Sequence, residues 1–157
     1  FEPGYSASIQ AVEFTELQWL TESENPDIKY FSGIAKYEIS FSFPVDKIQP
    51  ADSILFDLGE FESIAEITLN GASLGTLWKT GTYLPVKGIL KTENILEVKV
   101  ANIYRNRFIG DFVQYGKVQN LWTSSPITDF LNKDLPLQAS GLKGPMRIIS
   151  VSKQILN

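Results

Sequence analysis

The stretch that decides the fold is SIAEITLNGASLGTLW, residues 63–78. In its first half apolar and polar residues alternate, so that Ile67 and Leu69 face the same side of an extended strand. Asn70 and Gly71 then form a dipeptide typical of a two-residue hairpin, because both residues tolerate the positive φ of a type I′ turn. The stretch therefore predicts two antiparallel strands joined by a tight turn.

Four more segments alternate in the same way or form short apolar runs bounded by turn residues. They are residues 35–43, 54–59, 95–102 and 146–151. An opening strand is predicted at residues 9–14, and residues 79–94 are expected to be loop and turn. Short strands about ten residues apart, with almost no helical periodicity, indicate an all-β sandwich or barrel.

The chain is interpreted as a single domain, because 157 residues fit one compact unit and no linker or repeat divides residues 1–157. The alternation is lost between residues 111 and 137. One short helix is predicted there at residues 125–131, where Ser125 can cap the first turn and Pro126 can occupy the first helical position. We therefore expect a β-sandwich with at most one short helix.

Composition excludes several classes of function. Cysteine and histidine are absent, which excludes disulfides, thiolate metal sites and a Ser-His catalytic pair. The net charge of −4 and the scattered basic residues argue against nucleic acid as a partner. No apolar run reaches the length of about 18 residues that indicates a membrane span. No loop is dense enough in Asp and Asn to indicate calcium, so neither a metal nor a cofactor is expected.

The start of the chain, FEPGYSASIQ, lacks the basic and apolar regions of a signal peptide. Such an abrupt start is expected of a mature product or an excised piece.

The order of motifs resembles a known family. Residues 30–44, YFSGIAKYEISFSFP, followed by residues 55–102, are similar to the sugar-binding jelly-roll domain of family 2 glycoside hydrolases. The segments NIYRNRFIGD (102–111) and SGLKGPMRI (140–148) make the chain more similar still to the C-terminal sandwich of family 106 rhamnosidase-like enzymes. In that sandwich an Asn-Arg-hydrophobic-Ile-Gly-Asp run follows the same strand. The resemblance covers about residues 26–149.

The resemblance implies a galactose-binding-like jelly-roll β-sandwich that accompanies a catalytic domain in a bacterial polysaccharide-degrading enzyme. Such accessory sandwiches usually lack the catalytic carboxylates, and a catalytic barrel of about 250 residues does not fit in this chain. The chain would then be an excised, non-catalytic module of a longer extracellular or periplasmic glycoside hydrolase. Its partner would be an oligosaccharide or polysaccharide, or the adjacent catalytic domain. The alternative function is structural, in which the module orients that neighbour without binding sugar itself.

Four acids close together in the sequence are the candidates for catalysis. They are Asp57, Glu60, Glu62 and Glu66. Glycoside hydrolysis needs two carboxyl groups about 5 to 9.5 Å apart. Glu60 and Glu62 flank a predicted turn and Glu66 is on the polar side of a strand, where solvated acids are ordinary. We therefore expect no catalytic residue in this chain.

Carbohydrate binding requires an aromatic face against the C–H groups of a sugar ring, with polar groups nearby for its hydroxyls. The candidates are Trp78, Tyr83, Tyr104, Arg105 and Trp122, which are predicted to fall at strand ends or in loops. The alternative is that each aromatic residue closes the end of the sandwich and directs only its polar tip to water.

The motif NIYRNRFIGD is the remaining cluster of polar groups. Asn102 is expected to close a strand and Gly110 to supply unusual backbone angles, so that the chain turns sharply between them. An ion pair of Arg107 with Asp111 would fasten this turn, because unpaired buried charge is costly. In the alternative, Arg105 or Arg107 points into a cleft and donates to sugar hydroxyls or to the carboxylate of an acidic sugar. We favour the structural role for Asn102, Arg107 and Asp111.

Overall fold

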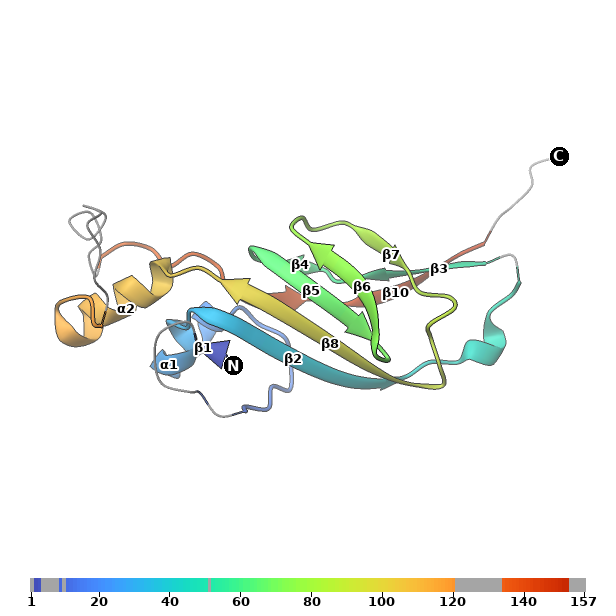
Figure 1. Cartoon of the computed structure of the whole chain (residues 1–157), viewed down its shortest axis with the longest axis horizontal. Helices are drawn as coiled ribbons and strands as arrows, with labels where there is room; N and C mark the ends of the chain where they lie inside the picture. The colour runs from blue at the N-terminus through green and yellow to red at the C-terminus, as the bar shows by residue number, and fades with distance from the viewer. Residues whose placement is uncertain (1, 4–8, 10, 51, 121–133, 153–157) are drawn as a thin grey trace.

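The structure is a computed structural model, and it describes residues 2–3, 9, 11–50, 52–120 and 134–152. Within these residues the chain is built mainly of β-strands that pack as two facing layers (Figure 1). This arrangement confirms the all-β sandwich. None of the helices in these ranges is long and apolar enough to cross a membrane.

The first layer is a five-stranded antiparallel sheet in the order β1-β2-β8-β5-β6. Its strands are β1 (Glu2–Pro3), β2 (Gly33–Ser42), β8 (Glu93–Asn102), β5 (Ile64–Leu69) and β6 (Ala72–Leu77). The hairpin between β5 and β6 turns at Asn70 (φ 52°) and Gly71 (φ 80°), in the left-handed region that a type I′ turn requires. The predicted hairpin is therefore confirmed.

The second layer consists of a three-stranded and a two-stranded antiparallel sheet. The larger has the order β10-β3-β7, with β10 (Arg147–Val151), β3 (Ser53–Asp57) and β7 (Tyr83–Pro85). The smaller pairs β4 (Glu60–Phe61) with β9 (Leu142–Gly144). The main core lies between the layers, where Ile67, Val98 and Leu142 are completely buried and contact a cluster that includes Ile54 and Phe56.

Two α-helices, α1 (Pro26–Lys29) and α2 (Arg105–Tyr115), and two short 3-10 helices, Leu20–Glu22 and Val45–Lys47, accompany the sheets. Helix α2 follows β8 and extends beyond the end of the sandwich (Figure 1). The sharp turn predicted for residues 102–111 is therefore wrong, because most of the motif is helical.

Gly110 has a different role from the one expected, since it is not among the residues with positive φ. It is buried in α2, and a β-carbon at this position would overlap the ring of Tyr30. Glycine thus permits close packing of the helix on the segment that carries Tyr30.

Two other segments differ from prediction. Residues 79–94 contain β7, whose three residues are too few to show a pattern and which is defined by its pairing with β3. Ile9 and residues 11–14 form no strand, and the strand that pairs with Gly33 and Ile34 at this edge of the sheet is β1 instead. The helix predicted at residues 125–131 lies outside the residues that the structure describes.

Candidate functional site

The α2 end of the sandwich is held by side chains that bond to backbone atoms. Asn106 Nδ2 donates to the carbonyl of Gln138 (2.6 Å), and the amide of Gln138 donates to Asn106 Oδ1 (2.9 Å). Asn106 is buried, so both of these bonds are shielded from water. Arg105 Nη2 donates to the carbonyl of Pro136 (3.0 Å). Arg105 and Asn106 therefore hold the backbone of residues 136–138 against helix α2.

Arg107 and Asp111 form an ion pair along the helix. Arg107 Nε donates to Asp111 Oδ1 at 2.7 Å, an i to i+4 contact. Asp111 Oδ2 also accepts from the amide of Gln119 (2.9 Å), beyond the end of the helix. The Asp111 side chain is 4% exposed and that of Arg107 is 21% exposed. The buried carboxylate thus connects α2 to the chain that leaves it.

Asn102, the last residue of β8, joins three parts of the fold. Its Nδ2 donates to the carbonyls of Val100 (3.0 Å) and Gly33 (3.3 Å). Its Oδ1 accepts from the amide of Gly141 (2.7 Å), just before β9. Asn102 and Gly141 are both buried, so water does not reach these backbone groups. The side chain of Asn102 supplies the hydrogen bonds that they need.

The aromatic candidates form two groups on different elements. Trp78 and Tyr83 flank the loop between β6 and β7, and they are 79% and 53% exposed. Tyr104 precedes α2 and stacks on Phe108, with ring centroids 6.0 Å apart. Trp122 lies outside the described residues.

The sheet register brings these two groups to the same end of the molecule. Ala65 pairs with Leu77, and its neighbour Ile64 pairs with Ala101. The strands β6 and β8 therefore end at the same side of the sheet, where the β6–β7 loop and α2 begin (Figure 1). The first group exposes aromatic faces, whereas Arg105 of the second group is engaged with a backbone carbonyl.

The four clustered acids each have a partner. Glu60 pairs with Lys143 (3.6 Å) and Glu66 with Lys99 (3.7 Å), and the side chains of both acids are more than half exposed. Glu62 accepts from Gln138 Nε2 (3.0 Å), while the buried Asp57 accepts from the amide of Gly59 (3.0 Å) and lies 3.8 Å from Arg147 Nη1. In the described ranges there is also no group of three or more Asp and Glu residues placed to hold a metal ion.

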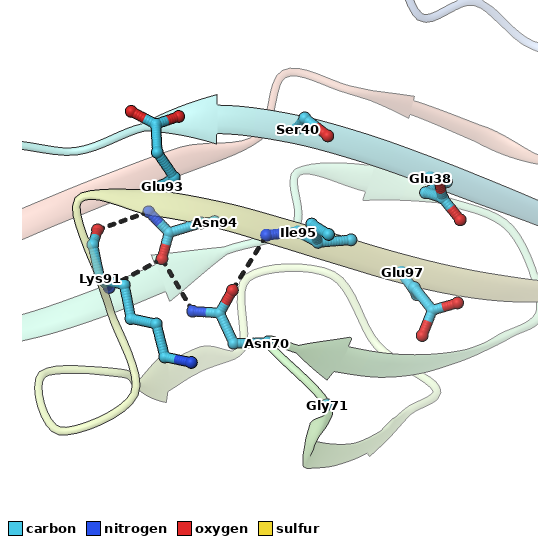
Figure 2. Close-up of a pocket in the computed structure, with 9 residues that line it drawn as sticks. All are labelled: Glu38, Ser40, Asn70, Gly71, Lys91, Glu93, Asn94, Ile95 and Glu97. Carbon is cyan, nitrogen blue, oxygen red and sulfur yellow. Dashed lines mark hydrogen bonds between the residues drawn. The ribbon is translucent and has the colours of Figure 1, made fainter.

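A depression that the sequence did not reveal lies over the outer face of the five-stranded sheet, near the β5–β6 hairpin (Figure 2). Its volume is about 730 Å³. Its lining is Glu38, Ser40, Asn70, Gly71, Lys91, Glu93, Asn94, Ile95 and Glu97. Asn94, buried at its floor, accepts from Asn70 Nδ2 and from the amide of Lys91, both at 2.9 Å. None of these lining residues is aromatic, so the depression lacks the stacking surface of a sugar site.

Like charges face each other across the β2–β8 pair beside this depression. Glu38 is directly opposite Glu97, and Lys36 is directly opposite Lys99, an arrangement that is unfavourable by itself. The diagonal contact of Lys36 Nζ with Glu97 Oε1 (2.6 Å) relieves it. The hydrogen bond and charge of Lys36 lower the pKa of Glu97. The part of this face around Lys36, Glu38, Glu97 and Lys99 is therefore a charged surface.

No family model matches the chain. A putative beta-glucuronidase of Formosa agariphila is 37% identical over 167 residues, which cover 93% of this chain and 14% of that protein. A rhamnosidase structure from Novosphingobium sp. PP1Y superimposes with a TM-score of 0.78 and 38% identity, over 89% of this chain and 13% of that one. The homologues of this chain are therefore glycoside hydrolases.

The chain thus spans only a small part of the glycoside hydrolases that it matches. A beta-D-glucuronidase structure from Dictyoglomus thermophilum matches 62% of the chain with a TM-score of 0.50 and 16% identity, a likeness of fold alone. The homologous segment is therefore one part of larger sugar-hydrolysing proteins.

Proposed function

We propose that the chain is a non-catalytic accessory module of a larger glycoside hydrolase. The observation that carries the proposal is the asymmetry of the matches: about nine-tenths of this chain aligns with a segment that makes up 13–14% of each relative. In finer terms the module is a galactose-binding-like jelly roll, related to the sandwiches of families 2 and 106. It acts outside the cell or in the periplasm.

The environment of the acids supports a role without catalysis. A general acid and a nucleophile or base must be free to face one glycosidic bond. Here Glu60 and Glu66 pair with lysines at the surface, Glu62 bonds to a glutamine, and Asp57 is tied to the backbone of its own turn. The reaction of the whole polypeptide would then be carried out by residues elsewhere.

Carbohydrate contact is assigned to the loop between β6 and β7. Trp78 exposes most of its indole there, and Tyr83 adds a second aromatic ring with a hydroxyl. Stacking of one sugar on an indole needs an accessible ring face, which Trp78 provides. Tyr104, Arg105 and Trp122 complete the proposed set, although Arg105 would have to release the carbonyl of Pro136 to reach a ligand.

Calorimetric titration with oligosaccharides tests this function. Because the relatives are named for glucuronide and rhamnoside chemistry, the ligands are oligosaccharides that contain glucuronic acid or rhamnose. We expect binding at up to millimolar concentration, lost in Trp78→Ala and retained in Tyr115→Ala, a matched control with an aromatic ring that is 59% exposed. Absence of binding to either class would refute sugar contact. Release of chromophore from aryl glycosides by this chain would refute the non-catalytic role.

A second candidate function is that the module orients a neighbouring domain without binding sugar. The outer face of the three-stranded sheet favours it, because Tyr83 and Val151 on that face are 53% and 48% exposed.

A further inference from the structure

The two layers of the sandwich present different outer faces. On the outside of the five-stranded sheet, Lys36 pairs with Glu97 and Lys99 with Glu66. Antiparallel strands with one face in water normally show this alternation of apolar and charged residues. The middle of that outer face is therefore charged and exposed to water.

The three-stranded sheet does not follow this rule. Ile54 and Phe56 of β3 and Ile148 of β10 belong to the core cluster or pack against it. Since side chains alternate along a strand, Leu55 and Ile149 lie on the opposite, outer face. Apolar residues therefore occupy both faces of this sheet, as in sheets that are covered on both sides.

The register makes the outer apolar residues contiguous. Leu55 is directly opposite Pro85 of β7 on one side and Ile149 of β10 on the other. Tyr83 is two residues before Pro85 on β7, and Val151 is two residues after Ile149 on β10, so both lie on the same face as this row. They are 53% and 48% exposed. These five residues cross all three strands and are called the outer patch below (β7, β3 and β10 in Figure 1).

We propose that the outer patch is the surface on which another domain of the same polypeptide packs. Single exposed apolar residues are ordinary, but a contiguous group across three strands marks an interaction surface. The proposal rests on the proposed function only in that the chain is part of a longer polypeptide, and it assigns Tyr83 to the docked surface in place of sugar contact. Its relatives support this occupant, because the matched segment is 14% and 13% of their length and the rest must adjoin it.

A domain in the same polypeptide suits a patch of five residues better than a free partner does. Linkage raises the effective concentration of the partner to about the millimolar range, so a small apolar contact suffices to hold it. Interfaces between domains of one chain are correspondingly modest, about 600–1,500 Å². Asp57 and Arg147 lie next to the patch and, at 3.8 Å, supply a polar margin.

Hydroxyl-radical footprinting of the intact polypeptide tests the proposal. Tyr83 and Tyr115 expose similar fractions of their surface, 53% and 59%, but only Tyr83 belongs to the outer patch. We expect Tyr83 to react at least several-fold more slowly than Tyr115 in the intact polypeptide. Equal reactivity of the two tyrosines would overturn the proposal.

Two variants of the intact polypeptide separate docking from general effects of a new charge. Leu55→Lys places an ammonium at the centre of the outer patch and is expected to restore the reactivity of Tyr83. Thr68→Lys is the control, since Thr68 is an outward, partly buried residue at a central strand of the other sheet. Restoration by Thr68→Lys as well, or by neither variant, would overturn the assignment of this face.

The failures of the two proposals are distinguishable. If the mature polypeptide has the mass of residues 1–157 alone, the module function fails and docking fails with it. A longer polypeptide in which Tyr83 is as reactive as Tyr115 refutes only the docking surface. Protection of Tyr83 that disappears on dilution assigns the patch to a second copy of the chain and also refutes docking within one polypeptide.

Discussion

The ion pair of Arg107 with Asp111 gives the most informative test of how the α2 end is held. Arg107→Ala removes a charged donor from a carboxylate that is 4% exposed, while the amide of Gln119 still donates to it. Removing one partner of a buried pair costs about 3–5 kcal/mol. Because Arg107 is itself 21% exposed, water can reach part of the site, and we expect the lower end, about 3 kcal/mol. That loss corresponds to a fall in Tm of about 6–12 °C for a domain of this size.

The companion variant Asp111→Asn separates charge from shape. The amide has nearly the same shape as the carboxylate, and its oxygen can still accept from Gln119. In the Arg107→Ala background it removes the stranded charge. We therefore expect the double variant to be about 1–2 kcal/mol more stable than Arg107→Ala alone, so the two effects are strongly non-additive.

Urea unfolding followed by tryptophan fluorescence measures all four proteins of this cycle, since the chain has three tryptophans. The reasoning is refuted if Arg107→Ala unfolds at the same urea concentration as the parent, or if the two substitutions simply add. Oligosaccharide titration of the same variants checks the alternative role, since a ligand-binding Arg107 would lower affinity without lowering stability.

Two further predictions concern packing and pH. Gly110→Ala should destabilise by about 1–3 kcal/mol, because the new methyl overlaps the Tyr30 ring; helix propensity alone would stabilise by about 1 kcal/mol, so an increase in Tm contradicts the packing argument. Burial raises the pKa of Tyr37 to about 12, so the folded state keeps a proton that the unfolded state loses near pH 10. Stability should therefore be present below pH 10 and decrease by roughly 2–3 kcal/mol between pH 10 and 12. Unfolding curves should show a smaller decrease for Tyr37→Phe, which also loses the bond from the amide of Leu142, and an equal decrease would contradict the assignment.

The predicted strands were those whose physical signal is local. The alternation in residues 63–69 and the Asn70-Gly71 turn depend on side-chain direction and on backbone angles, which the residues themselves determine. Strand β7 is too short for such a signal, and only its pairing with β3 defines it.

Helix α2 was not predicted, because Gly110 and the charged residues of the motif were interpreted as a sharp turn and the spacing of the other residues was not used. Tyr104 and Phe108, and Arg107 and Asp111, are each four residues apart, the spacing of neighbours on a helix. Gly110 was interpreted from its backbone freedom, whereas its small size is what the contact with Tyr30 requires.

The candidate site was predictable only in part. Trp78 and Tyr83 were singled out from sequence, and the structure places Trp78 in the loop between β6 and β7 and Tyr83 at the start of β7, both exposed. The outer patch could not be predicted, since Leu55, Pro85 and Ile149 become neighbours only through the register of three strands. These three residues are far apart in the sequence, and only the pairing of β3 with β7 and β10 brings them together.

The anchor of α2 has a consequence for how this region can change over time. Asn106 and Arg105 bond to the main chain of Gln138 and Pro136, so the identities of the side chains at 136 and 138 are not part of these bonds. Substitutions at those two positions can accumulate while the helix stays in place, provided that the backbone path is kept. The side chain of Gln138 is accordingly available for a separate contact, with Glu62. Neutral drift is therefore expected to be faster at positions 136 and 138 than at 105 and 106.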